Sequence, residues 1–175
     1  MPETTRHFVA TVYVVNDGAV ALHEHDKLGM WLPPGGHLDR DELPHEAARR
    51  ETREELGLDP ALLTESGDLR SPTVESLPEP AAFLLEDIDS VDGAIAHQHV
   101  DFVFFGRVDS RDVDPAPGEA SADAWEWIPP AELDAGGDRF ESDVRELGRR
   151  AVAAVEGGPG STSAPTGDDG GPESG

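Results

Sequence analysis

Three glutamates at helical spacing are the residues of this chain best suited to do chemistry. Glu51, Glu54 and Glu55 stand at positions i, i+3 and i+4, so a helix would present them on one face. Like charges at this spacing destabilise a helix by roughly 0.2–0.5 kcal/mol per pair, so we expect something to offset that cost. Clustered hard oxygen ligands suit Mg²⁺ or Mn²⁺, and the carbonyls of a glycine-rich turn before the helix could join them. The chemistry indicated is metal-assisted attack of water on phosphorus.

The residues around these glutamates separate a metal site from an ordinary acidic surface. Residues 36–58 resemble the Nudix box, in which a glycine, a glutamate, an Arg-Glu pair, a Glu-Glu pair and a second glycine follow at fixed spacing. The corresponding residues are Gly36, Glu42, Arg50, Glu51, Thr52, Glu54, Glu55, Gly57 and Leu58. Only Thr52 departs from the pattern, because it stands in an aliphatic place, where its partly apolar side chain can still face the core. Residues 31–36 and 127–133 resemble the lead-in and a late strand and turn of the same family.

The resemblance to MutT-like Nudix hydrolases implies an α/β fold and a set of roles. The fold would be an α/β/α sandwich, with a mixed sheet between helices and a catalytic loop-helix-loop. The implied Mg²⁺ ligands are the carboxylates of Glu51, Glu54 and Glu55 and the carbonyl of Gly36. Glu42 and Arg50 would form a structural ion pair that fixes the loop against the helix. The glutamates would orient a water and help to deprotonate it, while the metal neutralises charge on the phosphate oxygens.

Candidates for further roles lie outside the box. Members of the family often add a carboxylate from another loop, and we choose Glu119 over Asp123 for this position. Strand alternation puts His99 and Asp101 on one face, from which they could contact the base, sugar or phosphate of a substrate. Trp31 could contact a base. Each of these residues has an ordinary alternative, as an acidic loop residue, a polar strand-edge residue or a packing residue.

The leading hypothesis is a Mg²⁺-dependent pyrophosphohydrolase that cuts a diphosphate bond in a nucleoside diphosphate linked to a group X. A nucleoside triphosphate, a nucleotide sugar and a dinucleoside polyphosphate all fit this description, and the compact chain slightly favours nucleotides. The alternative is a Nudix-like domain that binds a nucleotide as a sensor without cleaving it, although such domains typically lose a box glutamate and this chain keeps all of them. A purely structural acidic protein is the third interpretation, and it would bind no divalent metal at the helix. The resemblance also allows a homodimer.

The residues that could do chemistry need a scaffold of strands and helices. Apolar and β-branched runs predict strands at residues 7–15, 19–23, 28–32, 82–88, 100–108 and 125–128. Helical periodicity predicts helices at 44–56, ended by Gly57, and at 140–155. Asn16-Asp17-Gly18 predicts a hairpin turn, residues 33–36 a break in regular structure, and residues 59–80 a loop. Four phenylalanines are expected in the core, namely Phe83, Phe102, Phe104 and Phe105.

Composition limits the partners and the compartment. The chain has 175 residues and a net charge of −24, from 37 acidic and 13 basic residues. Such a surface repels nucleic-acid polymers and anionic membranes, and its distributed acids and single lysine are typical of a halophilic protein that weakens at low salt. With no cysteine, no apolar leader and no membrane-length apolar run, we expect a cytoplasmic protein. No histidine pair at zinc-ligand spacing is accompanied by a third ligand, so we expect no histidine metal site.

Two regions of different composition divide the chain. Residues 1–156 would form the Nudix hydrolase domain, which is long enough to bury one core. Residues 157–175 are Gly, Pro, Ser, Thr, Asp and Glu with a single alanine, and a segment with so little to bury is expected to be disordered.

Overall fold

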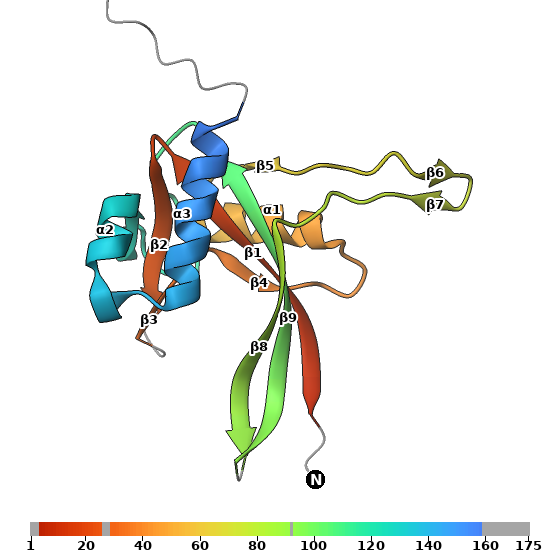
Figure 1. Ribbon diagram of the computed structural model, residues 1–175, viewed down its shortest axis with the longest axis horizontal. Helices are drawn as coiled ribbons and strands as arrows, with labels where there is room; N and C mark the ends of the chain where they lie inside the picture. Colours follow the sequence, from red (N-terminus) through yellow and green to blue (C-terminus); the bar gives the residue numbers. More distant parts are fainter. Residues whose placement is uncertain (1–3, 26–28, 92, 159–175) are drawn as a thin grey trace, which may run out of the picture.

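Two long parallel strands form the centre of the protein. The computed structural model describes residues 4–25, 29–91 and 93–158 (Figure 1). Strand β1 (Thr5–Asn16) pairs with β9 (Ala94–Arg107) over almost its whole length, from Thr5 opposite His97 to Val15 opposite Arg107. All other pairs in this eight-stranded sheet are antiparallel, so the sheet is mixed.

Each central strand changes its neighbour along its length. Strand β2 (Ala19–His25) pairs with the end of β1, whereas β4 (Gly35–His37) pairs with β1 at Val9–Thr11. In the same way β9 pairs with β5 (Ala61–Leu63) near its end and with β8 (Ala82–Val91) before it. Strands β3 (Met30–Leu32) and β10 (Trp125–Ile128) both pair with β2. Different strands therefore flank the first and second halves of β1 and β9. Strand β4 pairs in the first half of β1, and the chain continues from β4 into the next helix.

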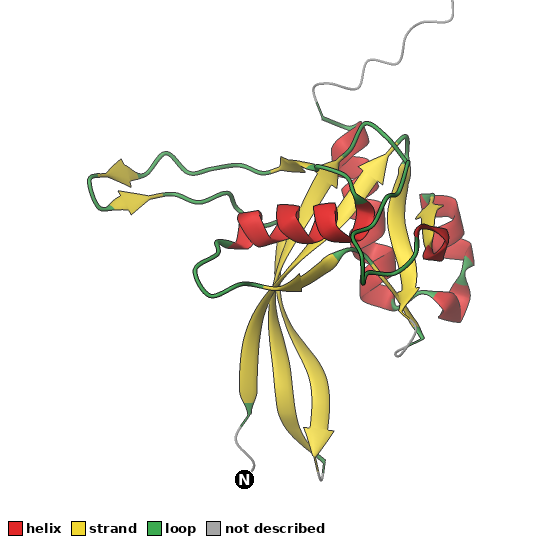
Figure 2. Ribbon diagram, turned by 180° about the vertical axis from the view of Figure 1, so that it is seen from behind, coloured by secondary structure: helices red, strands yellow, loops and turns green. Residues whose placement is uncertain are grey.

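Helices cover both faces of the sheet, because the apolar residues of β1 alternate. Val12 and Val14 pack with α1 (Pro44–Leu56), while Tyr13 and Val15 pack with α3 (Ser142–Glu156). Helices α1 and α3 lie on opposite faces in Figures 1 and 2, and the short α2 (Pro130–Ala135) lies beside α3. This is the expected α/β/α sandwich. Within the described ranges, no helix combines the length and apolarity needed to cross a membrane.

The elements with strong local signals were predicted best. Helix α1 has the predicted bounds, and Gly57 ends it in the left-handed conformation at φ 70°. The hairpin turn is confirmed by positive φ angles at Asp17 (46°) and Gly18 (73°). The predicted strands and the second helix are all present, with bounds shifted by a few residues or extended. Residues 26–28 and the expected tail from residue 159 onwards lie outside the described residues.

Two predictions about local structure were wrong, and one helix was missed. Residues 59–80 contain β5 and a hairpin of β6 (Arg70–Ser71) and β7 (Val74–Glu75), carried on an arm that extends from the body (Figure 1). Gly35 and Gly36 form a strand where a break was expected. An added Cβ at Gly35 would lie 2.8 Å from the Ala10 carbonyl oxygen, so glycine allows this close pairing with β1. Helix α2 was not predicted, although a proline at its first position is compatible with a helix start.

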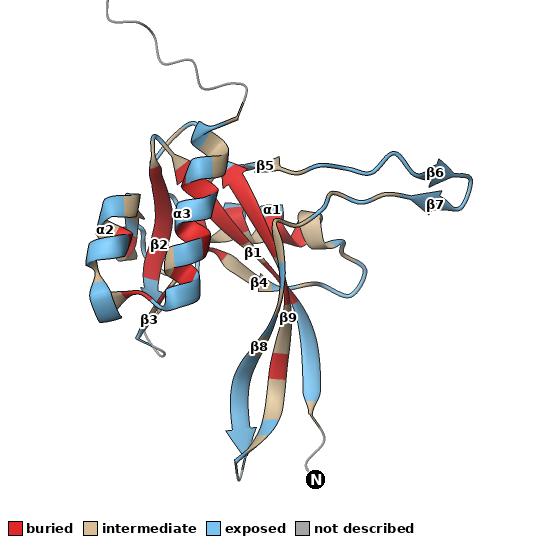
Figure 3. Cartoon of the chain, viewed as in Figure 1, coloured by how far each residue is buried: buried red, intermediate tan, exposed pale blue. Residues whose placement is uncertain are grey.

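The phenylalanine prediction was right in the middle of the sheet and wrong at its edge. Phe104 and Phe105 are buried and Phe102 is half-buried, but Phe83 is 62% exposed. Phe83 belongs to β8, which pairs with β9 alone among the described strands and extends with it beyond the helices (Figure 3). Phe8 of β1 is likewise exposed, and its ring lies 5.9 Å from that of Phe102.

Candidate active site

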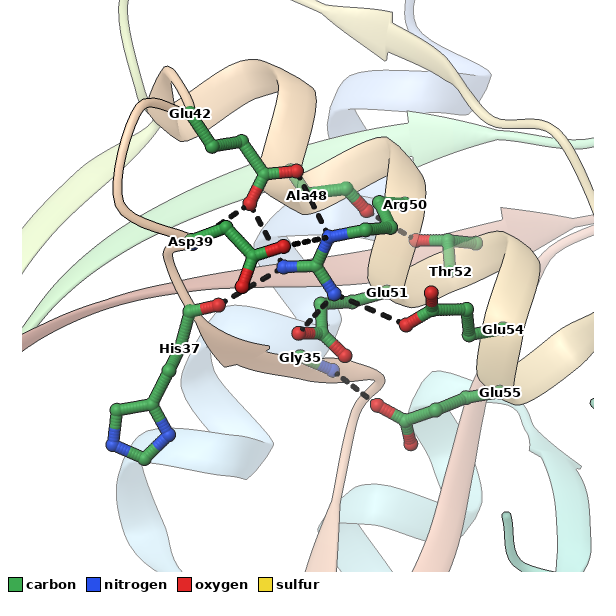
Figure 4. Close-up of polar contacts among 10 residues, drawn as sticks. All are labelled: Gly35, His37, Asp39, Glu42, Ala48, Arg50, Glu51, Thr52, Glu54 and Glu55. Atoms are coloured by element: carbon green, nitrogen blue, oxygen red, sulfur yellow. Dashed lines mark hydrogen bonds and ion pairs between the residues drawn. The ribbon is translucent and has the colours of Figure 1, made fainter. Parts of the chain in front are cut away.

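Arg50 is the centre of a polar network that joins the box loop to helix α1. Its Nε and Nη2 donate to the two carboxylate oxygens of Glu42, at 2.9 and 2.8 Å (Figure 4). Its Nη1 donates to Glu51 at 2.7 Å and to Glu54 at 3.0 Å. Nη2 also donates to the His37 carbonyl at 3.0 Å. One guanidinium thus connects strand β4, the loop and two glutamates of the helix.

The buried face of α1 decides where the glutamates point. Its buried residues are Ala47, Ala48, Thr52 and Leu56, each fully inaccessible to solvent. The Thr52 hydroxyl donates to the Ala48 carbonyl at 2.8 Å, so a polar atom in an aliphatic place is satisfied within the helix. These residues form one buried stripe, and the prediction that Thr52 can face the core is confirmed. Because the stripe fixes the rotation of the helix, the carboxylates of the other face are directed toward the loop and β4.

The loop before α1 is also tied by backbone contacts. The amide of Asp39 donates to Glu42 at 3.0 Å, and the amide of Leu43 donates to Glu46 at 3.0 Å. The Glu46 contact satisfies an amide at the helix start, and Pro44 needs no such bond because it has no N–H. The loop therefore enters the helix in one defined conformation.

Two of the helix carboxylates, those of Glu51 and Glu55, are largely covered where they lie against the glycine turn. Glu55 has a 12% exposed side chain and accepts a hydrogen bond from the Gly35 amide at 2.9 Å. Burial raises its pKa to about 8, the Gly35 hydrogen bond opposes this rise, and the charges of Glu51 and Glu119 add to it. The pKa of Glu51 is also raised, by burial first, although its contact with Arg50 opposes the shift. Glu54 is 44% exposed and is the most accessible of the three.

The loop after β9 brings Glu119 close to this group. The Ala116 amide donates to the Glu54 carbonyl at 2.7 Å, and the Asp114 amide donates to the Leu56 carbonyl at 3.0 Å. These bonds hold the loop against the last turn of α1 and satisfy carbonyls that the helix leaves free. The negative charge of Glu119 raises the pKa values of both Glu51 and Glu55, whereas Asp123 is not among the residues that shift them.

The other predicted substrate residues lie in two different environments. Asp101 is 3% exposed, burial and the nearby Glu86 raise its pKa to about 7, and its Oδ1 has no hydrogen-bond partner among the described residues. His99 is half-buried, and burial together with neighbouring histidines lowers its pKa to about 4. Trp31 is 8% exposed, with the guanidinium of Arg139 lying 4.1 Å from its ring centre.

Sequence reasoning missed some residues of this region. Glu86 was not singled out, although it lies opposite His99 on β8 and contributes to the raised pKa of Asp101. His7, His37 and His97 have ligand nitrogens within 4.8 Å of one another. They come from three strands, so no spacing along the chain could reveal the group, and the expectation of no histidine metal site did not take it into account.

The comparisons with known families agree with this geometry. A model of the NUDIX domain family matches residues 5–148, which include the whole box. The chain therefore belongs to the Nudix hydrolase family, as the motif predicted. A Nudix-family hydrolase from Clostridium perfringens has a similar structure, with a TM-score of 0.75 at 29% identity, covering 87% of this chain and 99% of the other. A MutT protein from Methanosarcina mazei Go1 shares the fold, with a TM-score of 0.59 at 18% identity over 86% of this chain and 96% of the other.

The curated relatives of this chain are named as isomerases and not as hydrolases. The isopentenyl-diphosphate Delta-isomerase of Streptomyces coelicolor is 31% identical over 139 residues, which are 75% of this chain and 61% of the isomerase. That of Streptomyces griseus is 36% identical over 87 residues, covering 46% of this chain and 42% of the isomerase. The chain thus spans less than two thirds of the length of either relative.

Proposed function

We propose that this protein is a pyrophosphohydrolase that cleaves a diphosphate bond in a nucleoside diphosphate linked to a group X. The observation that carries the proposal is the set of three helix carboxylates held against a glycine turn and one arginine. Glu51 and Glu54 both accept hydrogen bonds from Arg50, and Glu55 accepts one from the Gly35 amide. A purely solvated acidic face would not need two of its carboxylates largely covered, which raises the pKa values of Glu51 and Glu55.

The donor set fits Mg²⁺, with Mn²⁺ as the second choice. Glu51, Glu54 and Glu55 supply hard oxygens, and Glu119 adds a further carboxylate from the neighbouring loop. A Cβ on Gly36 would collide with the carboxylate of Glu51, so the backbone of Gly36 lies close enough for its carbonyl to be a ligand beside the three helix glutamates. When bound, the cation would neutralise charge on the diphosphate and favour the ionised form of a nearby water.

The residues of the chain would then divide the work. The most accessible carboxylate, Glu54, would orient the attacking water and accept its proton. Glu55 and Glu51 are held in place by burial and by their hydrogen bonds, so they would fix the position of the cation. Arg50 and Glu42 would hold the loop against the helix, so that the glycine turn keeps a fixed position relative to the glutamates.

Asp101 and His99 are the proposed contacts for the group that carries the diphosphate. A buried carboxyl group with a pKa near 7 and an unpartnered oxygen can either donate or accept a hydrogen bond, which suits the polar edge of a base. The role of Trp31 as a base contact stays a prediction. Its packing against Arg139 and Phe140 favours a structural role, because little of its ring is accessible.

A second candidate substrate is a diphosphate ester of an isoprenoid alcohol. The two curated relatives are named for an isomerase of isopentenyl diphosphate, and moving a double bond requires one group to give a proton and another to take one. Asp101 and Glu86, both with raised pKa values, are the carboxyl pair that this chain could offer. Hydrolysis is preferred, because this chain keeps every glutamate and the arginine of the box and its fold resembles that of a Nudix-family hydrolase over 99% of that protein.

A substrate panel tests the proposal. The full chain is incubated in high salt with Mg²⁺ and one of four classes: nucleoside triphosphates, nucleotide sugars, dinucleoside polyphosphates or isopentenyl diphosphate. Products are identified by chromatography. Release of a nucleoside monophosphate that stops with EDTA supports the proposal and names the class. Conversion of isopentenyl diphosphate without loss of phosphate would support the second candidate. A folded protein that binds nucleotide and Mg²⁺ but turns over nothing would support the sensor alternative instead.

A further inference from the structure

Four histidines from three strands meet on one side of the sheet. His7 lies on β1, His37 on β4, and His97 and His99 on β9. Strand register explains the meeting, because His7 pairs with His99, and Val9, two residues along the same face of β1, pairs with His37. Ring centres are 4.6 Å apart for His7 and His97 and 5.0 Å apart for His37 and His99. The rings of His97 and His99 are also 5.0 Å apart, so the group is continuous.

The nitrogen atoms of this group have the spacing of metal ligands. His7 Nδ1 and His37 Nε2 are 3.3 Å apart. Two nitrogens bound to one tetrahedral Zn²⁺ at about 2.0–2.1 Å lie about 3.3–3.4 Å from each other. A ligand nitrogen of His97 lies within 4.8 Å of both, and His99 is in ring contact with His37. A shift of about 1.5 Å or less in the side chain of His97 would bring three nitrogens around one ion.

We propose that His7, His37 and His97 bind one divalent transition-metal ion of the zinc class, with the ring of His99 packed beside them. Imidazole nitrogen suits Zn²⁺ and its neighbours in the first transition row, whereas Mg²⁺ prefers oxygen, so the two sites differ in the ion they select. The histidine site is also separate from the carboxylates in space. The ring of His37 points away from Arg50 and the helix glutamates, while its carbonyl oxygen points toward Arg50 (Figure 4).

A hydrogen bond outside the group supports this assignment. Thr5 Oγ1 lies 2.9 Å from His97 Nδ1 and 3.3 Å from the Ala96 carbonyl. If the hydroxyl gives its proton to Ala96, it accepts one from His97 Nδ1, and the Nε2 lone pair of His97 is left for an ion. Metal-bound histidines commonly donate their second N–H in this way, which fixes the ring and its tautomer.

The competing explanation is a polar cluster held by a histidine–histidine hydrogen bond alone. It accounts for the short contact between His7 and His37, and strand register brings the two rings from β9 beside them under either explanation. The two explanations therefore differ in one measurable outcome, which is stoichiometric metal binding. An ion would also have a mechanical consequence. It would connect β4, which leads into the box loop, to both central strands, so its binding should stabilise the fold.

Metal binding by the full chain tests the proposal without reference to activity. The protein is stripped with a chelator and placed in excess Mg²⁺, which occupies the carboxylates. Co²⁺ is then titrated and followed by its visible absorption, and Zn²⁺ is added to compete. Wild type, His7→Asn and His97→Asn are compared with two controls. His45→Asn changes a histidine of α1 outside the group, and Glu54→Gln changes the carboxylate site. Circular dichroism checks that each variant is folded.

The proposal expects one equivalent of Co²⁺ bound by the wild type, displaced by Zn²⁺, with a raised Tm. Each variant within the group should weaken the affinity at least tenfold, while both controls bind as the wild type does. Absence of stoichiometric binding in the wild type would overturn the proposal. So would unchanged binding in both group variants, or a loss in Glu54→Gln equal to theirs. Because the readout is not hydrolysis, this result is independent of the proposed function.

Discussion

Arg50 donates a hydrogen bond to each carboxylate oxygen of Glu42, at 2.9 Å from Nε and at 2.8 Å from Nη2. The pair is partly buried, with 26% of the Arg50 side chain and 14% of the Glu42 side chain exposed. Because the same guanidinium also contacts Glu51 and Glu54, the pair sets the distance between the loop and the helix carboxylates. An ordinary surface ion pair would contribute little to the free energy of unfolding. This pair differs because it has the planar two-bond geometry that only an arginine side chain provides.

Replacing the pair should therefore damage activity more than it damages the fold. Arg50→Lys keeps the positive charge but loses the paired hydrogen bonds to Glu42, and we expect kcat to fall at least roughly tenfold. A double-mutant cycle with Glu42→Gln should give a coupling energy of about 1–2 kcal/mol in the free energy of unfolding. Urea denaturation of the four proteins measures that coupling. Additive effects of the two changes would show that the contact does not stabilise the fold.

The same pair predicts a pH dependence of stability. The hydrogen bonds from Arg50 lower the pKa of Glu42 below its ordinary value of 4.5, so the folded protein holds this proton less tightly than the unfolded chain does. The resulting stabilisation is complete above about pH 5 and is lost as the pH falls through the lowered pKa. The difference in unfolding free energy between wild type and Glu42→Gln should therefore shrink below about pH 4.5.

The matched control for this experiment is Glu75→Gln. Glu75 pairs with Arg70 on the exposed arm, where both side chains are more than half exposed. We expect little difference from the wild type at any pH for this variant. If Glu42→Gln behaved in the same way, the proposed contribution of the Arg50–Glu42 pair would be wrong.

Gly36 offers a test of close packing in the glycine turn. A Cβ at this position would collide with the Glu51 carboxylate. Gly36→Ala should therefore push Glu51 aside, weaken Mg²⁺ binding and lower turnover by roughly 100-fold, with the circular dichroism spectrum unchanged. Gly158→Ala is the control, because an added Cβ there has only ordinary contacts at 3.5 Å. Full activity in Gly36→Ala would mean that Glu51 has no fixed position to lose.

Thr52 shows how a departure from the family pattern is accommodated. Its side chain is fully buried and its hydroxyl is satisfied by Ala48 of the same helix. Thr52→Val removes that bond but places a methyl group in an apolar site, so the unfolding free energy should change by less than about 1 kcal/mol. Activity should stay within about twofold, because the helix keeps its rotation. Thr52→Asp, which buries a charge, should unfold at a much lower denaturant concentration. Equal stability of the two variants would contradict the burial of this residue.

The box could be predicted from the sequence because its signals are local. Pro44, Gly57 and the periodic small residues between them set the bounds and buried face of α1 within a short stretch of chain. Alternation likewise put His99 and Asp101 on one face. Register between distant strands leaves no comparable local mark. His7 and His97 are joined only by the pairing of β1 with β9, and the exposure of Phe83 depends on how far β8 extends beyond the helices.

The central claim is that the glutamates of α1 do the chemistry, and Glu54 tests it most directly. Glu54→Gln removes one charged oxygen from a side chain that is 44% exposed, so the fold should be unaffected. Glu146→Gln makes the same change on α3, on a side chain that is 55% exposed. The measurement is Mg²⁺-dependent turnover of the best substrate of the panel by both variants and the wild type. We predict a loss of at least roughly 100-fold in Glu54→Gln and none in Glu146→Gln. Wild-type turnover in a folded Glu54→Gln variant would contradict the account.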